Sequence, residues 1–265
     1  MNPYDVDHPP AAPRLPGTVC LRRHADDTID ALALDLLTQA EACVRAFGDF
    51  HLALSGGSTP LPLYRRLMLD PRFRHLPWTR THLWIVDERR VSFDDPASNF
   101  AQIRDILVDH SGIPEAQVHP MEATEPDADI RYEQTLRSVL EWRERGQDRL
   151  DFVVLGMGAD AHTASLFPRS IALRDRTDPP RLVLINDGPE VTPPPRVTMT
   201  AHLLNASRCV AVLVTGAAKA KTLARVSAAW RLEDPALADE LPILSINPKA
   251  GELRWYLDWQ ACITE

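Results

Sequence analysis

The feature that most constrains the fold of this chain is an alternation between short, continuously apolar runs and longer amphipathic segments. Continuous apolar runs are typical of strands that are covered on both faces, as in parallel sheets. The predicted strands are residues 51–54, 81–86, 151–155, 181–185, 209–215 and 242–246. The predicted helices are residues 26–47, 60–69, 97–109, 128–145 and 217–229. Strands and helices in alternation predict an α/β, Rossmann-like fold with a mostly parallel sheet and helices on both faces.

The domain organisation follows from length and from the distribution of proline. The chain has 265 residues, 45% of them hydrophobic, which is ample for a real core. Residues 1–17 contain Pro3, Pro9, Pro10, Pro13 and Pro16 but few large apolar groups. Such a composition predicts an extended, poorly ordered tail. We therefore expect a single α/β domain over residues 18–265, with the tail outside the function.

Composition also excludes several classes of protein. The net charge of −8, from 29 basic and 37 acidic side chains, argues against a protein that neutralises nucleic-acid phosphates. No apolar run approaches the roughly 20 residues of a membrane helix, and the first residues do not resemble a secretion signal. Cysteines are few and dispersed, so neither a disulfide framework nor a zinc site is indicated. We expect a cytoplasmic protein without a nucleic-acid or membrane partner.

Ligands in open α/β sheets bind beyond the C-terminal ends of the strands, so the loops that follow the predicted strands are the candidate ligand sites. The loop after Leu54 contains two glycines, which permit a tight turn with converging backbone N–H groups before a helix. Its residues are Ser55, Gly56, Gly57, Ser58 and Thr59. This loop is a candidate phosphate cradle, and an ordinary strand-to-helix turn is the alternative.

A cluster of charged residues follows Val86 at the next strand end. Asp87 and Arg89 belong to it, and a solvated turn would have the same composition. Their place at the expected ligand edge favours a site. Downstream, Asn99 opens a predicted helix, where the sequence favours a capping role over a ligand contact.

The stretch GMGADAHTASLFP, residues 156–168, admits two interpretations. Gly-x-Gly-x-x-Ala after a strand resembles a dinucleotide fingerprint, which needs a full helix after the glycines. Pro168 would interrupt that helix after about one turn. In the second interpretation the glycines shape a sharp loop that projects Asp160 and His162 into the cleft. Histidine titrates near neutral pH and a nearby carboxylate can orient it, so His162 is the candidate general base.

Two cations complete the candidate site. Lys219 falls in the first turn of a predicted helix, where a cation is unfavourable unless an anion binds there. Arg196 begins a short extended segment. Each residue alone has the pattern of a surface cation, but together with the loop after Leu54 they can outline one phosphate pocket.

These segments, in this order, resemble the 6-phosphogluconolactonases, which share a Rossmann-like fold with the glucosamine-6-phosphate isomerases and deaminases. The resemblance covers nearly the whole chain from about residue 18. It implies hydrolysis of 6-phospho-D-glucono-1,5-lactone in the pentose phosphate pathway, with His162 as general base and Asp160 beside it. It also implies that the first loop, Arg196 and Lys219 hold the 6-phosphate, and that Asp87 and Arg89 lie in the cleft.

Two features bear on alternatives to this function. The family's usual Asp-Gly-His is here Asp160-Ala161-His162, and an alanine at positive φ would strain the loop by roughly 1 kcal/mol. This departure keeps a non-catalytic sugar-phosphate sensor in view. The related deaminases typically continue to a glutamate, for which this chain has no carboxylate in residues 165–168.

The expected mechanism therefore needs one base to activate water and a donor to stabilise the developing oxyanion. It calls for no metal and no cofactor. The expected partner is a small sugar-phosphate lactone, and the protein itself is expected to be a monomer or a small homo-oligomer.

Overall fold

The structure of the chain is a computed structural model that describes residues 8–263. Its main sheet has seven parallel strands in the order β1-β10-β9-β6-β2-β3-β5. These strands are β1 (Thr18–Arg22), β2 (Phe50–Leu54), β3 (Thr81–Ile85), β5 (Val118–His119), β6 (Phe152–Leu155), β9 (Cys209–Val214) and β10 (Glu252–Asp258). The predicted fold class, α/β with a mostly parallel sheet, is confirmed.

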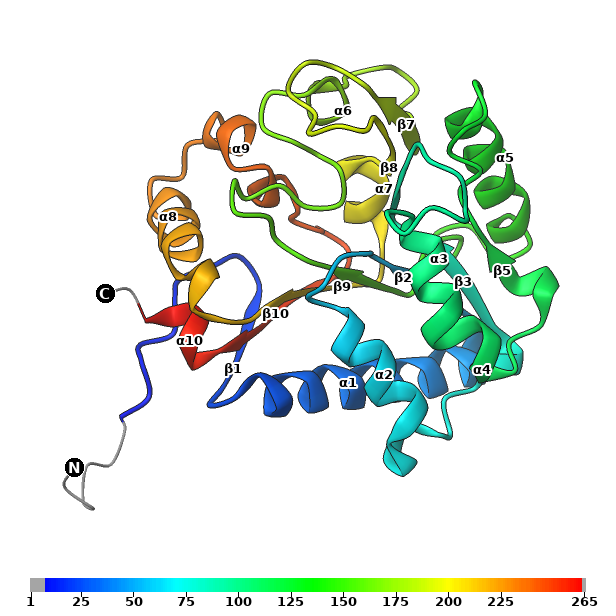
Figure 1. The fold of residues 1–265 in the computed structure, drawn as a ribbon, viewed down its shortest axis with the longest axis horizontal. Coiled ribbons are helices and arrows are strands. Elements are labelled where there is room, and N and C mark those ends of the chain that lie inside the picture. Colours follow the sequence, from blue (N-terminus) through cyan, green and yellow to red (C-terminus); the bar gives the residue numbers. More distant parts are fainter. Residues whose placement is uncertain (1–7, 264–265) are drawn as a thin grey trace.

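Helices lie on both sides of this sheet (Figure 1). The longest, α1 (Ala25–Phe47), runs along one side, where it contacts β1, β2 and β10 and packs against α2 (Leu61–Leu69). On the opposite side lie α7 (Ala201–Ala206) and α8 (Ala220–Trp230) (Figure 1). The remaining helices are α3 (Asn99–Ile103), α4 (Asp109–Ser111), α5 (Ala128–Leu140), α6 (Ile171–Arg174), α9 (Leu237–Glu240) and α10 (Trp259–Cys262). Within residues 8–263 no helix combines the length and apolarity needed to cross a membrane.

A second sheet of three antiparallel strands stands beside the main one. It consists of β4 (Asp87–Arg89), β8 (Arg196–Met199) and β7 (Val183–Asn186). Because β4 follows β3 after a single residue, Val86, the chain passes directly from the main sheet into this one. The predicted strand 181–185 therefore exists as β7, but it belongs to the antiparallel sheet.

The continuously apolar runs form the interior of the main sheet. All residues of β2, β6 and β9 are buried, as expected for strands with helices on both sides. Two strands at the β1 side of the sheet were not predicted. β1 is the edge strand with no buried residue, and β10 interrupts its apolar residues with Glu252, Arg254 and Asp258. Their sequences therefore lack the continuous apolar pattern.

The prediction of a strand at residues 242–246 was wrong. Residues Pro242–Ser245 form a 3₁₀ turn, η6, whose Ile243 is fully buried. The backbone N–H of Ile243 donates to the carbonyl of Ala161 at 3.0 Å, so this turn supports another loop instead of pairing with a strand. A short apolar run does not by itself distinguish a strand from a buried turn.

The predicted helix 128–145 ends earlier, at Leu140. Beyond this point Arg143 turns inward, and its side chain is only 2% exposed. Its guanidinium donates to Asp49 Oδ1 at 2.6 Å and to Asp151 Oδ2 at 2.8 Å. These buried ion pairs outweigh continuation of the helix, and they tie together the segments that enter β2 and β6.

The proline-rich N-terminal segment is described only from residue 8. Leu15 is buried, and the carbonyl of Pro16 accepts a hydrogen bond from Trp255 Nε1 at 2.9 Å. Residues 1–7 lie outside the described residues. The division into a tail and a domain over residues 18–265 stays a prediction.

A row of stacked rings lies at the β5 side of the sheet. His82 stacks on His119 with ring centroids 5.3 Å apart, and His119 stacks on Trp84 at 3.8 Å. Burial lowers the pKa of His82 to about 4 and that of His119 to about 3. Both rings are therefore neutral in the folded protein at pH 6, where the unfolded chain already binds protons at these positions.

We predict that the free energy of unfolding falls as the pH is lowered from about 7 to about 4.5, because protons bind preferentially to the unfolded chain in this range. His119→Phe should reduce this loss by roughly 2–3 kcal/mol, because the folded pKa of about 3 lies well below pH 4.5 while the unfolded histidine takes up its proton near pH 6.5. Urea unfolding at pH 7 and at pH 4.5 measures this loss in the free energy of unfolding. The control is His110→Phe, because His110 is exposed on α4. Equal acid losses in wild type and His119→Phe would contradict the prediction.

Candidate active site

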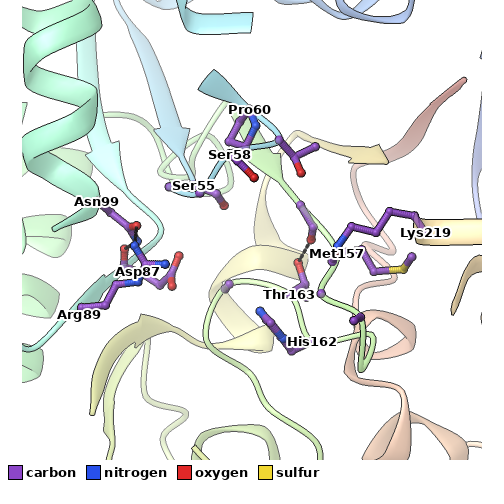
Figure 2. A pocket seen from close by; sticks show the side chains of 17 residues that line it. Ser55, Ser58, Pro60, Asp87, Arg89, Asn99, Met157, His162, Thr163 and Lys219 are labelled. Carbon is purple, nitrogen blue, oxygen red and sulfur yellow. Dashed lines mark hydrogen bonds between the residues drawn. The ribbon is translucent and has the colours of Figure 1, made fainter. Parts of the chain in front are cut away.

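A cavity of about 330 Å³ opens at the C-terminal ends of β2, β6 and β9. Figure 2 shows Asp87, Arg89 and Asn99 on one side of it, His162 and Lys219 on the other, and Ser55 and Ser58 between them. The full lining is Ser55, Gly56, Gly57, Ser58, Thr59, Pro60, Asp87, Arg89, Asn99, Gly156, Met157, Gly158, Ala159, His162, Thr163, Ala164 and Lys219. The structure thus brings most of the predicted site residues into one pocket.

The loop after β2 presents unpaired hydrogen-bonding groups to this pocket. The hydroxyl of Ser55 is buried and has no hydrogen-bond partner among the described residues. Within residues 8–263 no acceptor takes a hydrogen bond from the backbone N–H groups of residues 56–59. Tyr64, from α2, fixes the start of the loop by donating to the carbonyl of Ser55 at 2.5 Å. A buried hydroxyl and backbone N–H groups that lack partners just before a helix are suited to an anion.

The opposite wall is formed by β4 and the beginning of α3. Arg89 Nη1 donates to Asn99 Oδ1 at 2.5 Å, and Asn99 Nδ2 donates to the carbonyl of Asp87 at 2.6 Å. The cap of α3 is Ser98, whose hydroxyl accepts from Ala101 N at 3.1 Å. The capping role that the sequence favoured for Asn99 was therefore wrong, because its side chain lies against Arg89 and the pocket.

Sequence reasoning did not single out Glu88, which fixes this wall from behind. Its carboxylate is fully buried and accepts hydrogen bonds from Asn99 N at 2.7 Å and from Phe100 N at 2.8 Å. The hydroxyl of Ser98 and the backbone N–H of Arg89 also donate to it. Burial raises the pKa of Glu88 although these four donors oppose the shift. Glu88 therefore joins β4 to the first turn of α3.

Residues 156–163, after β6, form a closed loop that carries His162. The N–H of Gly158 donates to the carbonyl of His162 at 2.8 Å, and Thr163 Oγ1 donates to the carbonyl of Gly156 at 2.9 Å. A Cβ at Gly158 would lie 2.2 Å from His162 Nδ1, so only glycine allows the ring its position. Phe167 packs against this ring, with centroids 4.6 Å apart.

Asp160 determines the tautomer of the His162 ring. Asp160 Oδ1 lies 2.6 Å from His162 Nδ1. Burial alone would raise the pKa of Asp160, but the hydrogen bonds and charge of His162 hold it below its ordinary value. An ionised carboxylate can only accept, so Nδ1 carries the proton of the neutral ring and Nε2 is left bare. A bare Nε2 at a pocket wall can act as a general base.

Ala161, which departs from the expected glycine, adopts a φ of 66°. This is the left-handed region, so the methyl group costs the loop roughly 1 kcal/mol relative to glycine. The residue is fully buried, and its carbonyl accepts from Ile243 N at 3.0 Å. The surrounding contacts thus hold the strained loop in a conformation that keeps the contact between Asp160 and His162.

The two predicted cations occupy different places. Lys219 lines the pocket immediately before α8, and its Nζ donates to the carbonyl of Met157 at 2.7 Å. Arg196 does not line the pocket. It donates to the carbonyl of Pro194 and lies over the ring of Phe167, 5.9 Å from its centroid. Burial, and then the nearby Arg89, lower the pKa of Arg196.

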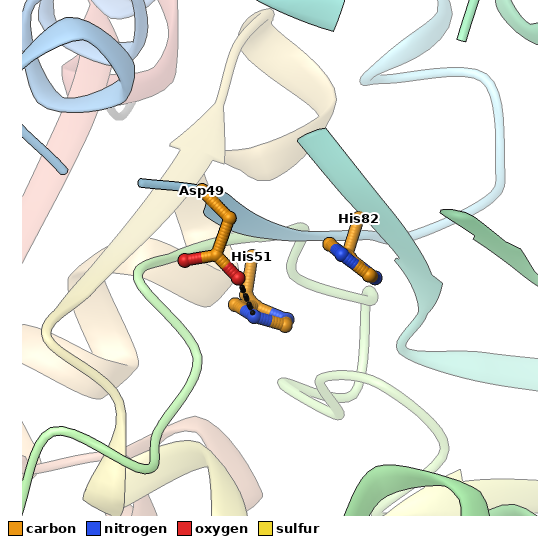
Figure 3. A group of neighbouring side chains, drawn as sticks. All are labelled: Asp49, His51 and His82. Carbon is orange, nitrogen blue, oxygen red and sulfur yellow. Dashed lines mark hydrogen bonds and ion pairs between the residues drawn. The ribbon is translucent and has the colours of Figure 1, made fainter. Parts of the chain in front are cut away.

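A separate group of side chains has the composition of a metal site. Among the described residues, Asp49, His51 and His82 hold potential ligand atoms within 4.8 Å of one another (Figure 3). The group lies at the N-terminal ends of β2 and β3, opposite the pocket. His51 Nε2 is already bonded to Asp49 at 2.8 Å, and its Nδ1 accepts from Trp84 at 3.1 Å. Arg143 holds the other oxygen of Asp49, so these groups satisfy one another.

Comparison with known proteins relates most of the chain to one family. Residues 23–255 match the sequence profile described as glucosamine-6-phosphate isomerases/6-phosphogluconolactonase. A 6-phosphogluconolactonase of Nostoc sp. is 39% identical over 236 residues, which cover 86% of this chain and 90% of that protein. The GDH/6PGL endoplasmic bifunctional protein of Homo sapiens is 37% identical over 245 residues, covering 89% of this chain. The match spans only 29% of that longer protein.

A solved structure extends the comparison to three dimensions. The crystal structure of 6-phosphogluconolactonase from Thermotoga maritima superposes with a TM-score of 0.69 at 29% sequence identity. The match covers 91% of this chain and 99% of that one. The similarity therefore extends over nearly the whole of both chains.

We predict that Gly158→Ala displaces the His162 ring, because the added Cβ would collide with Nδ1. The free energy of unfolding should drop by roughly 1–3 kcal/mol, as expected for an overpacked site. Gly156→Ala is the matched control, since an added Cβ there meets nothing within 4 Å. Urea unfolding gives the free energy of unfolding of each variant, and NMR gives the imidazole resonances of His162. If Gly158→Ala and Gly156→Ala changed both to the same extent, the close contact at Gly158 would not be what positions the ring.

Proposed function

Because the chain belongs to the glucosamine-6-phosphate isomerase/6-phosphogluconolactonase family, we propose that it hydrolyses 6-phospho-D-glucono-1,5-lactone to 6-phospho-D-gluconate. One observation carries the proposal. The bare Nε2 of His162 and the anion-binding loop of residues 55–59 line the same pocket. This juxtaposition suits a substrate with a phosphate at one end and a carbonyl for attack by water at the other.

The phosphate occupies the part of the pocket formed by Ser55, the amides of residues 56–59 and Lys219. The unpartnered Ser55 hydroxyl and the free N–H groups supply donors, and Lys219 supplies a charge. On phosphate binding, the Lys219 ammonium exchanges the Met157 carbonyl for an anionic oxygen, which is a stronger acceptor. Arg196 acts from behind Phe167 and contributes positive charge without direct contact.

Phosphate binding fixes the lactone ring so that its C1 carbonyl faces His162. His162 Nε2 takes a proton from water as the water oxygen bonds to C1. Asp160 stabilises the imidazolium that forms, because it already accepts from Nδ1 at 2.6 Å. When the C1–O5 bond breaks, Nε2 returns the proton to the departing ring oxygen. Arg89 and nearby backbone N–H groups face the charge that develops on the carbonyl oxygen.

The local structure around His162 favours hydrolysis over isomerisation or deamination. Sugar-phosphate isomerisation moves protons between carbon and oxygen, and the related deaminases typically supply a glutamate for it, whereas residues 165–168 here hold no carboxylate. The Phe167 ring is buried and packs on His162. The sensor alternative rested on Ala161, and the intact contact between Asp160 and His162 favours turnover. The cytoplasmic location, the absence of a nucleic-acid partner and the oligomeric state stay predictions from the sequence.

We predict that His162→Ala lowers kcat for the lactone by roughly 10²–10⁴-fold, the usual contribution of a general base. The lactone is generated in situ at slightly acidic pH, where uncatalysed hydrolysis is slower. Binding of 6-phosphogluconate, measured by calorimetry, should stay within about threefold of wild type. His202→Ala, exposed on α7, is the control. A wild-type protein that binds the product without accelerating hydrolysis would move the assignment to a sensor.

We predict that Lys219→Ala acts on substrate binding instead of on the chemical step. Loss of a charge-assisted contact to phosphate should raise KM by about tenfold or more while kcat stays within about threefold. Steady-state kinetics on the same lactone separate the two constants. An unchanged KM would remove Lys219 from the phosphate site.

A further inference from the structure

A single side-chain contact joins the two walls of the pocket. Ser165 follows the His162 loop, and its hydroxyl donates to Asp87 Oδ2 at 2.5 Å. Asp87 lies on β4, in the opposite wall. Within residues 8–263 no other hydrogen bond connects β4 with residues 156–168. The contact therefore sets the position of the Asp87 carboxylate relative to His162.

Ser165 is itself rigidly held by the second sheet. Its N–H donates to Thr198 Oγ1 at 3.1 Å, and its carbonyl accepts from Asn186 Nδ2 at 2.8 Å. Thr198 is on β8, directly opposite Asp87 in the register of the sheet, and Asn186 is on β7. Ser165 is only 1% exposed. Because both backbone groups of Ser165 are fixed by two different strands, the hydroxyl has little freedom to leave Asp87.

Asp87 lines the pocket and has an unused acceptor. Among the described residues, none donates a hydrogen bond to its second oxygen, Oδ1, and no lysine or arginine forms an ion pair with it. Arg89, two residues away, donates from its guanidinium to Asn99 Oδ1 and to the carbonyl of Ala97 instead. A carboxylate in a pocket that lacks an ion-pair partner and has one open oxygen is suited to accept from a neutral donor. The ring hydroxyls of a sugar lactone are such donors.

We propose that Ser165 is a positioning residue that holds Asp87 so that its free oxygen accepts a hydrogen bond from a ring hydroxyl of the lactone. The inference rests on the proposed function and deepens it. Asp87 discriminates substrates by their hydroxyl pattern, whereas His162 acts on the carbonyl. A site built to pair with a hydroxyl rejects an analogue that lacks it, because the buried acceptor is then left unpaired.

The first test is a double-mutant cycle on kcat/KM for 6-phosphogluconolactone. Ser165→Ala should lower it by about ten- to a hundredfold, as expected for a hydrogen bond to a charged group. Asp87→Asn should lower it at least as much, and the double variant should match Asp87→Asn within about twofold. Multiplied losses in the double variant would overturn the proposal, because Ser165 would then act independently of Asp87.

Ser170→Ala is the matched control. Ser170 is equally buried and its hydroxyl also contacts Asn186, but it does not touch Asp87. The Ser170→Ala variant measures the effect of losing a buried serine hydroxyl in this region. Because Ser170 does not touch Asp87, the kcat/KM of this variant should stay within about threefold of wild type. A loss in Ser170→Ala as large as in Ser165→Ala would assign the effect to the loop and overturn the positioning role.

A second test uses substrate structure and does not depend on Ser165→Ala folding. The 2-deoxy, 3-deoxy and 4-deoxy analogues of the lactone each remove one ring hydroxyl. Wild type should lose about tenfold or more in kcat/KM on at least one analogue, and Asp87→Asn should lose less than about threefold on the same one. If no analogue distinguishes wild type from Asp87→Asn, the hydroxyl contact is refuted. Turnover of the parent lactone by wild type tests the proposed function separately. A failure of the proposed function is therefore distinguishable from a failure of the hydroxyl contact.

Discussion

The pairing of β2 with β6 and of β6 with β9 brings loops far apart in the sequence to one edge of the main sheet. All three strands are parallel and buried, so their C-terminal ends necessarily meet at that edge. The loop of residues 55–59, the His162 loop and Lys219 follow these ends in turn. The opposite wall arises differently, because the chain leaves β3 and enters a second sheet through β4. The pocket therefore lies where the two sheets meet.

Rigidity of the His162 loop is the second requirement of the account. The loop is closed by its own backbone hydrogen bonds, held from below by the turn at Ile243, and joined to the second sheet through Ser165. These contacts maintain Ala161 in the left-handed region and keep Asp160 on Nδ1 of His162. The strain energy at Ala161 is small compared with the stabilisation that these contacts give the loop together. The unprotonated state of Nε2 thus depends on the backbone conformation, which keeps Asp160 against Nδ1, as well as on the two side chains.

The sequence predicted the parts of this arrangement that depend on local pattern. Continuous apolar runs located β2, β6 and β9, and the strand-end rule identified Ser55, His162 and Lys219 as neighbours. It could not predict contacts made by residues with ordinary local roles. Ser165 acts through partners 21 to 78 residues away. Glu88 acts through a loop that folds back on it 10 to 12 residues later, and no spacing marks either residue. The capping role expected for Asn99 was wrong because its side chain bonds Arg89 and Asp87 on β4. Arg196 lies outside the pocket lining because β8 pairs with β4 across more than a hundred residues, and its role at the phosphate stays a prediction.

Catalysis by His162 requires that it presents an unprotonated Nε2 to the pocket while Nδ1 donates to Asp160. Nitrogen NMR of the ¹⁵N-histidine-labelled protein at mildly alkaline pH measures the protonation of both ring nitrogens directly, with His162→Ala to assign the signals. We expect a protonated Nδ1 and a bare Nε2 in wild type, and a mixture of tautomers in Asp160→Ala. A proton found on Nε2 in the wild-type protein would contradict the role of His162 as the base that activates water.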